Sequence, residues 1–212
     1  MTDTRGDVRH GRTGAYDPRS LAPWVTLLLI ILLLAAATLV APRARAEAPA
    51  FTLRSTGYED GVPGSPVSFS LADYRGRTVV LDFMAVECEP CRAVASDFLL
   101  PLWTKEGGRA DFAILSIDTW AATSVPNWLP GLETDARLVA LQKAAGLPWR
   151  HALDTDGVWQ KYDAQGLPKL AVVGPDGRLL YTTSDVPDLP AVEAAVRESL
   201  LQWEGGRSDP QG

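Results

Sequence analysis

Apolar residues gather in short runs along the chain, and the spacing of these runs predicts alternating strands and helices. Residues 79–85 and 112–117 are almost continuously apolar, which is typical of strands buried on both faces. Residues 67–71 alternate between apolar and polar positions, as a half-buried strand does. Two later runs, 170–173 and 179–182, flank the turn sequence Pro-Asp-Gly-Arg and predict a hairpin.

Helical periodicity appears between these strands. Residues 89–103 place their apolar side chains on one stripe, and Pro101 is expected to bend or end this helix. Residues 132–145 form a second helical pattern, and residues 190–203 form an amphipathic helix near the end of the chain. This order of elements, with a hairpin late in the chain, predicts an α/β sandwich around a mixed sheet.

The longest apolar run lies near the N-terminus. Residues 21–41 carry no charge, and a run of this length can span a bilayer. Arginines are more frequent before the run than after it, which favours a cytoplasmic N-terminus. We therefore predict a single transmembrane anchor with an extracytoplasmic domain behind it. A cleaved signal peptide is the alternative, since Ala44-Arg45-Ala46 has the pattern of a cleavage site and the domain would then be secreted.

These patterns divide the chain into five predicted segments. They are a cytoplasmic tail (1–20), the anchor (21–41), a linker with a first short strand (42–66), the folded domain (67–205) and a flexible tail (206–212). The net charge of −6, without a basic stripe, argues against a nucleic-acid partner. His10 and His151 lie on opposite sides of the predicted anchor, so they cannot share a metal site, and no bound cofactor is expected.

The two cysteines of the chain form one motif, Cys88-Glu89-Pro90-Cys91, directly after the apolar strand 79–85. This spacing places both sulfurs on the first turn of one helix, where a small disulfide ring can close. Backbone N–H groups and the helix dipole favour a thiolate at Cys88, which we assign as the attacking nucleophile. Cys91 faces inward and is assigned as the resolving thiol. An inert disulfide is disfavoured, because so short a loop constrains little unfolded chain.

Three motifs, together with the cysteines, resemble the thioredoxin superfamily. They are Leu81-Asp82-Phe83 ahead of the cysteines, Gly166-Leu167-Pro168 before a strand, and the hairpin sequence at 173–178. Residues 51–203 are most similar to membrane-anchored, extracytoplasmic thiol–disulfide oxidoreductases of the TlpA/ResA type. The resemblance implies a thioredoxin-like fold, with a mixed central sheet flanked by helices, an N-terminal strand extension and an inserted strand–helix region.

The Glu-Pro pair between the cysteines matches the ResA-like proteins of cytochrome c maturation. The chain also departs from the family pattern. Glu87 stands where the family usually has tryptophan, and Met84 stands where many members have an aromatic residue. Residues 93–95 lack the acidic residue that the ResA-like proteins carry there. A role in cytochrome c maturation is therefore an expectation that rests on the Glu-Pro pair alone.

Two further site residues follow from these motifs. A carboxyl among apolar neighbours is desolvated, which raises the pKa of Asp82, and the resemblance places Asp82 beneath the cysteines, where it takes the proton of Cys91. The alternative is an aspartate at a strand edge, paired with a lysine or an arginine. The resemblance also implies a cis peptide bond at Leu167-Pro168, opposite the dithiol, with the backbone of Leu167 open to a substrate strand.

The residues around Cys88 are expected to tune its reactivity. Negative charge at Glu87 and Glu89 raises the pKa of the Cys88 thiol and stabilises the disulfide, Arg92 offsets part of this effect, and Pro90 belongs to the same group. We predict a reducing centre, nearer to the roughly −270 mV of thioredoxin than to the roughly −120 mV of DsbA. The alternative is that both glutamates are solvated and contribute little.

The sequence thus predicts a membrane-tethered enzyme that reduces disulfides in secreted proteins. Its predicted partners are disulfide-bearing proteins and, by resemblance only, a membrane electron donor of the CcdA/DsbD kind. A disulfide oxidase or isomerase on the same fold remains an alternative, as does a copper chaperone that holds Cu(I) on two thiolates. A peroxidase is disfavoured, since Cys88 lacks the preceding Pro-x-x-x-Thr-x-x pattern. His151 has no identifiable cysteine or carboxylate partner and is assigned a structural role.

Overall fold

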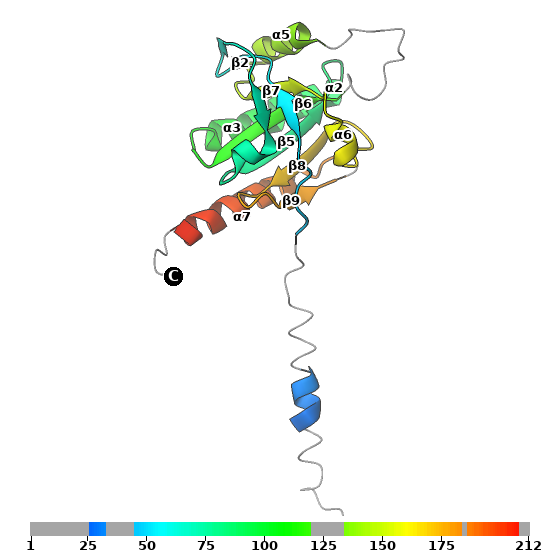
Figure 1. Ribbon diagram of the computed structural model, residues 1–212, viewed down its shortest axis with the longest axis vertical. Helices are drawn as coiled ribbons and strands as arrows, with labels where there is room; N and C mark the ends of the chain where they lie inside the picture. The colour runs from blue at the N-terminus through cyan, green and yellow to red at the C-terminus, as the bar shows by residue number, and fades with distance from the viewer. Residues whose placement is uncertain (1–25, 33–44, 120–133, 184–185, 208–212) are drawn as a thin grey trace, which may run out of the picture. The chain divides into compact units, whose positions relative to one another are not determined.

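The computed structural model describes residues 26–32, 45–119, 134–183 and 186–207 (Figure 1). The chain divides into two compact units, Met1–Ala44 and Arg45–Gly212. In the first unit, residues 26–32 are helical, and the rest of the predicted anchor lies outside the described residues. Among the residues that are described, none of the helices combines the length and the apolar character that a bilayer crossing requires.

A five-stranded mixed sheet forms the centre of the second unit (Figure 1). Its strands are β5 (Thr78–Met84), β6 (Phe112–Asp118), β7 (Arg150–Leu153), β8 (Lys169–Val173) and β9 (Leu179–Thr182). The spatial order is β7-β6-β5-β8-β9, in which β5, β6 and β7 are parallel and β8 and β9 are antiparallel to their neighbours. Every residue of β5 and β6 is buried, because both faces of the sheet are covered. The predicted mixed sheet is therefore confirmed.

Alternate residues of each strand enter two different cores. On one face, Val80 and its neighbours pack against helices that follow β5 and that close the chain, through residues such as Leu99 and Val196. On the other face, Phe83 packs with residues of the N-terminal extension and with Tyr162, near α6 (Val158–Lys161). The last helix, α7 (Leu189–Arg207), runs along the first of these faces (Figure 1).

The helix that follows β5 consists of three consecutive pieces. They are α2 (Glu89–Val94), the π-helical turn η3 (Ala95–Leu99) and α3 (Leu100–Glu106). Pro101 lacks the N–H that an α-helix would bond to the preceding turn. Of the two expected effects, a bend or an end, the end does not occur, since α3 includes Pro101. In the π turn, the N–H of Leu100 donates to the carbonyl of Ala95, and this wider turn lets the helix continue past the proline.

Helix α5 (Asp135–Ala145) realises the second helical pattern of the sequence. The Oγ1 of Thr134 caps its N-terminus by accepting from the N–H of Arg137 at 3.3 Å. Gly146 ends it with a φ of 65°, a left-handed conformation that glycine adopts readily. Residues 132 and 133 of the predicted helix lie outside the described residues.

The segment expected to be mainly a linker is packed structure from residue 45 onward. β1 (Thr52–Arg54) pairs with β4 (Ser68–Ser70), which leads into η2 (Leu71–Tyr74), while β2 (Tyr58–Glu59) and β3 (Val62–Pro63) form a hairpin. Asp60 and Gly61 both have positive φ, as a tight hairpin turn requires. The Asp-Gly pair in the sequence was the signal for this hairpin. The predicted N-terminal strand extension is confirmed, and it is larger than expected.

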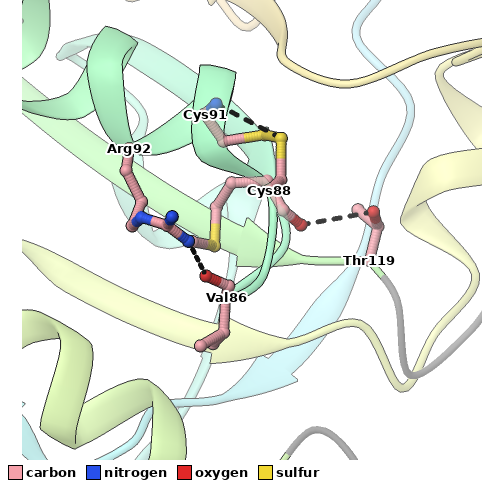
Figure 2. Close-up of a disulfide and its surroundings, with 6 residues drawn as sticks. Val86, Cys88, Cys91, Arg92 and Thr119 are labelled. Carbon is pink, nitrogen blue, oxygen red and sulfur yellow. Dashed lines mark hydrogen bonds between the residues drawn. A yellow bond between two sulfur atoms is a disulfide. The ribbon is translucent and has the colours of Figure 1, made fainter.

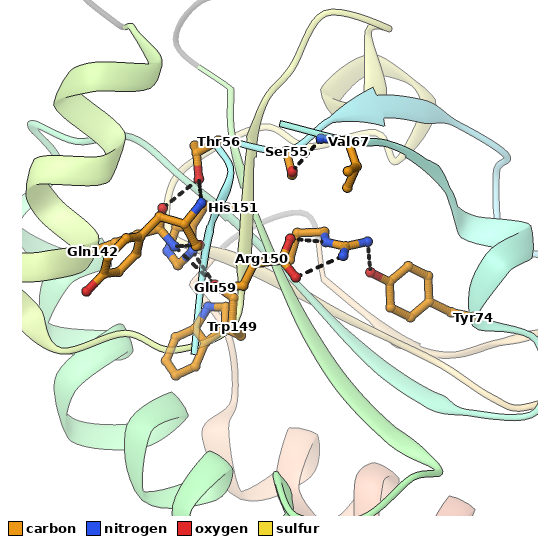
Figure 3. Close-up of polar contacts among 10 residues, drawn as sticks. Ser55, Thr56, Glu59, Val67, Tyr74, Gln142, Trp149, Arg150 and His151 are labelled. Carbon is orange, nitrogen blue, oxygen red and sulfur yellow. Dashed lines mark hydrogen bonds and ion pairs between the residues drawn. The ribbon is translucent and has the colours of Figure 1, made fainter. Parts of the chain in front are cut away.

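A buried amide ties this extension to the sheet (Figure 3). Gln142 of α5 is fully buried, and its Oε1 accepts from Thr56 Oγ1 at 2.8 Å. Its Nε2 donates to the carbonyls of Tyr58 at 2.9 Å and of Trp149 at 3.1 Å. The amide of Gln142 therefore holds the β2–β3 hairpin, α5 and the start of β7 together, with its oxygen and both of its N–H donors bonded.

A second polar contact fixes the same hairpin from the other side of β7 (Figure 3). The guanidinium of Arg150 donates to both carboxylate oxygens of Glu59, at 2.6 and 2.8 Å. It also donates to the hydroxyl of Tyr74 at 2.9 Å. The proximity of Glu59 raises the pKa of Arg150 above its ordinary value, so this bidentate pair stays charged.

We expect Gln142→Ala to lower the free energy of unfolding by about 2–4 kcal/mol, because three partners each lose a hydrogen bond and two of them, Thr56 and Trp149, are buried. Urea unfolding of the variant and of the wild type measures the difference. The exposed Gln160→Ala, on α6, is the matched control and should change stability by no more than about 0.5 kcal/mol. Equal stability losses in the two variants would contradict this role of Gln142.

Candidate active site

Cys88 and Cys91 are joined in a disulfide at the start of α2, with their Cα atoms 5.2 Å apart (Figure 2). Cys88 is the N-cap residue, and its Sγ accepts a hydrogen bond from the N–H of Cys91 at 3.2 Å. Cys88 is partly exposed, whereas Cys91 is 1% exposed. An attacking group can therefore reach Cys88, and Cys91 is reached only from within the protein.

The loop between β5 and the disulfide is held by hydrogen bonds to its backbone carbonyls (Figure 2). Nη1 of Arg92 donates to the carbonyl of Val86 at 2.8 Å. The N–H of Thr119 donates to the carbonyl of Met84 at 2.9 Å, and the N–H of Cys88 donates to that of Ala85 at 3.1 Å. The guanidinium of Arg92 is therefore directed at the loop backbone.

The charges expected to tune Cys88 are arranged differently from the prediction. Glu87 and Glu89 are both exposed. Glu87 accepts from Nη2 of Arg137, which extends from α5. Arg137, rather than Arg92, therefore offsets the charge of Glu87. Pro90 occupies the first turn of α2, where its missing N–H leaves no intrahelical bond unmade.

Asp82 lies in the middle of β5 and is 1% exposed. Its Oδ2 accepts a hydrogen bond from Ser116 Oγ at 2.6 Å. Burial raises the pKa of Asp82 to about 7, and the bond from Ser116 offsets only part of this rise. The raised pKa agrees with the expectation from the sequence. Ser116 supplies this hydrogen bond, in place of the lysine or arginine of the alternative interpretation.

A small internal cavity connects Asp82 to the helix that carries the cysteines. It measures about 20 Å³ and is lined by Asp82, Met84, Arg92, Ala95, Leu141, Ala145, Leu147 and His151. Arg92 and Ala95 follow Cys91 along the helix, and Met84 packs against Cys91 in one apolar cluster. The structure therefore places the carboxyl of Asp82 next to the helix segment that begins at Cys91.

The loop before β8 brings a third predicted element to the dithiol. The peptide bond between Leu167 and Pro168 is cis, as expected from the sequence. The side chain of Leu167 is partly buried and packs against the cluster that contains Met84, Cys91 and, at its edge, Cys88. Cys88, Cys91, Asp82, Leu167 and Pro168 are thus gathered by three separate segments of the chain.

Sequence reasoning missed two residues of this site. Ser116 is the register partner of Asp82 on β6, and Nε1 of Trp149 donates to its Oγ at 2.8 Å. The signal for Ser116 was a single hydroxyl in an otherwise apolar strand, but its partner depends on a parallel register that the sequence does not specify. Trp149 itself is buried, at 2% exposed.

A buried cation next to the cis proline was also missed. Lys169 is 1% exposed, and its Nζ donates to the carbonyl of Thr183. Burial lowers the pKa of Lys169 below its ordinary value. As to metals, no three His, Cys, Asp or Glu side chains come together as a metal site within the described residues.

Comparison with known proteins shows similarity at the level of structure. No family model matches the sequence, and no curated protein matches it. A candidate protein disulfide isomerase from Bacteroides thetaiotaomicron has 24% identity and a TM-score of 0.58, over 79% of this chain and 96% of that one. A thioredoxin-family thiol:disulfide interchange protein from Chlorobium tepidum has 18% identity and a TM-score of 0.57, over 76% and 99%.

A third similar structure is the thioredoxin domain of a thiol-disulfide oxidoreductase from Bacteroides vulgatus. It has 23% identity and a TM-score of 0.52, over 73% of this chain and 99% of that one. At these identities the likeness defines the fold. The unit that begins at Arg45 therefore has the thioredoxin-like fold, with a mixed sheet and flanking helices.

Proposed function

We propose that the protein is a thiol–disulfide oxidoreductase that works through the dithiol of Cys88 and Cys91. The observation that carries this proposal is a disulfide between an accessible N-cap cysteine and a buried cysteine, close to a buried carboxyl. Similar structures named as thiol-disulfide oxidoreductases support it. The disulfide state is the oxidised form that such an enzyme reaches at the end of a reductive cycle.

The reductive cycle begins with the reduced dithiol. The thiolate of Cys88 attacks one sulfur of a substrate disulfide, and the substrate S–S bond breaks as the mixed disulfide forms. The first substrate sulfur leaves as a thiolate. The N–H of Cys91 hydrogen-bonds to the Sγ of Cys88, and in the reduced form this donor and the helix N-terminus stabilise the attacking thiolate.

The second step needs a base inside the protein, since Cys91 is buried. The carboxylate of Asp82 takes the proton of the Cys91 thiol, and the resulting thiolate attacks the Sγ of Cys88. The second substrate sulfur leaves as a thiolate, and the Cys88–Cys91 disulfide forms. Two electrons pass from the dithiol to the substrate. A pKa of about 7 suits Asp82 to this role, because it can hold or release a proton near neutral pH.

Protein substrates would bind at the loop of Leu167 and Pro168. Leu167 packs at the edge of the cluster that includes Cys88, so a chain that lies along this loop passes the reactive sulfur. Backbone pairing with Leu167 would hold such a chain without regard to its sequence. We accordingly propose disulfide-bearing proteins as the substrate class.

We further propose that the enzyme is tethered to the membrane through residues 21–41, with its thioredoxin-like domain outside the cytoplasm. The length and apolar character of this segment and the preceding arginines support the proposal. A membrane electron donor of the CcdA/DsbD kind would restore the dithiol, and the resemblance to TlpA/ResA proteins makes cytochrome c maturation a candidate pathway. The mass of the mature N-terminus separates a retained anchor from a secreted form cleaved after Ala46.

The roles of the two cysteines are separated by trapping. We expect Cys91→Ser to accumulate a mixed disulfide between Cys88 and a protein substrate, because the resolving thiol is missing. Cys88→Ser should trap nothing and should lose disulfide reduction. The variant is incubated with disulfide-bonded insulin, and non-reducing gels and mass spectrometry detect the adduct. An adduct on Cys91 in the Cys88→Ser variant would reverse the assignment.

We expect Asp82→Asn to slow the resolution of the mixed disulfide about a hundredfold, because the base is lost. The raised pKa of Asp82 also predicts an effect on stability. The folded protein binds this proton more tightly than the unfolded chain does, so the contribution of Asp82 to stability is lost as pH rises from about 4 to about 7. Burial lowers the pKa of His151 to about 4, which produces an opposite slope over part of the same range. Urea unfolding of the wild type and of Asp82→Asn from pH 4 to 8 isolates the Asp82 contribution as the difference between the two proteins, worth about 2–4 kcal/mol in total.

The loss of stability with rising pH should be absent in Asp82→Asn, which keeps only the opposite slope of His151 and is expected to be the more stable protein at pH 8. Asp97→Asn, which changes an exposed carboxyl of η3, is the control and should retain the slope. An unchanged resolution rate together with an unchanged slope in Asp82→Asn would rule out Asp82 as the base.

The direction of electron flow is tested by the redox potential. We expect a value below about −230 mV against glutathione buffers, as a reductase requires. Glu89→Gln should raise it by about 10 mV, since removing an exposed negative charge favours the Cys88 thiolate by about 0.5 kcal/mol. Glu193→Gln, on α7, is the control and should leave it unchanged. A wild-type value above about −180 mV would indicate an oxidase or isomerase instead.

A further inference from the structure

Two unpartnered polar atoms line the internal cavity next to the active-site helix. Asp82 Oδ1 and His151 Nε2 are buried, and neither has a hydrogen-bond partner within the described part of the chain. Both side chains line the same cavity of about 20 Å³. Leaving either atom without a partner in a water-free interior is costly, so the pair calls for an explanation.

The sheet brings these two residues together. Asp82 of β5 is in register with Ser116 of β6, and Ser116 is in register with His151 of β7. Register partners on neighbouring strands project to the same face of a sheet. Asp82 and His151 therefore flank Ser116 on the face covered by α2, η3 and α5. Their backbones are two strand spacings apart, about 9.6 Å, and the distance between the ends of the two side chains is shorter.

The protonation of His151 follows from its other ring nitrogen. Nδ1 lies 2.9 Å from the carbonyl oxygen of Trp149, which can only accept a hydrogen bond, so Nδ1 carries the proton. Burial lowers the pKa of His151 to about 4, and the ring is neutral at pH 7. Nε2 is consequently an acceptor. Asp82 Oδ1 is also an acceptor when the carboxyl is ionised.

Two acceptors that face one cavity need a partner that donates twice. A water molecule does this, and a cavity of about 20 Å³ holds one water. The remaining lining is apolar apart from Arg92, so Asp82 and His151 are the partners that orient such a water. With an ionised carboxyl, the water donates to Asp82 and to His151. With a protonated carboxyl, the acid donates to the water, which still donates to His151.

We propose that His151 is a positioning residue for Asp82, and that it holds one water molecule between its Nε2 and Asp82 Oδ1. The proposal rests on the function inferred above, in which Asp82 takes the proton of Cys91. The water gives the carboxylate a second donor beside Ser116. Because a donor stabilises the charged form more than the neutral form, His151 keeps the carboxyl ionised to a lower pH than burial alone would allow.

Other charged groups near this pair are few, and each has a defined place. Arg92 lines the cavity from α2, and its Nη1 donates to Val86. Asp118, two residues after Ser116 on β6, projects to the same face of the sheet and is buried. Helix α5 contributes only Leu141 and Ala145 to the cavity. Lys169 is in register with Phe83 and so belongs to the opposite face.

Two substitutions separate the cavity contact from the rest of His151. His151→Asn keeps a side-chain N–H for the carbonyl of Trp149 and removes the acceptor that faces the cavity. His151→Gln places an amide oxygen near the position of Nε2 and is the rescue variant. Both are made in the full chain, beside Asp82→Asn and the double variant of Asp82→Asn with His151→Asn.

The first measurement is the titration of the Asp82 carboxyl by infrared difference spectroscopy, in the oxidised protein, with Asp82→Asn to identify the band. We expect His151→Asn to raise the midpoint by about one pH unit and His151→Gln to restore most of the wild-type value. An unchanged midpoint in His151→Asn overturns the proposal. Because this titration needs no turnover, it tests the pair even if the protein proves not to be an oxidoreductase.

The second measurement follows the reaction of the reduced protein with 5,5′-dithiobis(2-nitrobenzoate). The first thiolate released reports attack by Cys88, and the second reports resolution by Cys91. If the midpoint of the Asp82 titration rises by one pH unit, about a tenth of Asp82 is ionised at pH 7 instead of half. His151→Asn should therefore slow the second phase about fivefold and leave the first phase unchanged. Adding His151→Asn to Asp82→Asn should change nothing more.

The outcomes separate a failure of the proposed oxidoreductase function from a failure of the proposed role of His151. If both phases are absent in the wild type, the proposed oxidoreductase function fails, and the infrared shift alone decides the role of His151. If the phases are present and His151→Asn changes neither the midpoint nor the second phase, the proposal fails and the function stands. Should His151→Asn not fold, the ¹⁵N shift of His151 Nε2 in the wild type must follow the Asp82 midpoint, and a flat shift from pH 5 to 9 overturns the proposal.

Discussion

The desolvation of Asp82 is the constraint on which the candidate site depends, because burial in the middle of a strand raises the pKa of this carboxyl to about 7, where it can take up or release a proton near neutral pH. The apolar layers on both faces of β5 produce this desolvation, and Ser116 moderates it by donating one hydrogen bond. The buried carboxyl therefore lowers the stability of the folded protein at neutral pH, and it places an acid with a pKa of about 7 next to the helix of the buried cysteine.

Parallel pairing of β5, β6 and β7 extends this constraint across the sheet. Asp82, Ser116 and His151 follow one another in register, and Trp149 adds a donor to Ser116 and a carbonyl to His151. The same carbonyl accepts from Gln142, whose amide also holds the N-terminal hairpin. The polar groups near the active site thus belong to one hydrogen-bonded layer that reaches from the proposed proton acceptor to the N-terminal extension.

The sequence predicted β5, β6, β8 and β9 of the central sheet, the dithiol helix and the place of Asp82, because apolar runs and short motifs are local signals, but it did not predict β7. It left open whether the helix bends or ends at Pro101, and it did not predict the π turn through which the helix continues. The sequence also did not predict the partners of Asp82 and His151, since strand register is a property of the assembled sheet. The pairing of Arg137 with Glu87 has no local signal in the sequence, because the two residues lie fifty positions apart in the chain.

Arg92 has one consequence that reaches beyond the loop it holds. Its side chain donates to the Val86 carbonyl and also forms part of the wall around the Asp82 cavity. The conformation of the loop before Cys88 and the shape of the cavity beside Asp82 are therefore coupled, because one side chain contacts both.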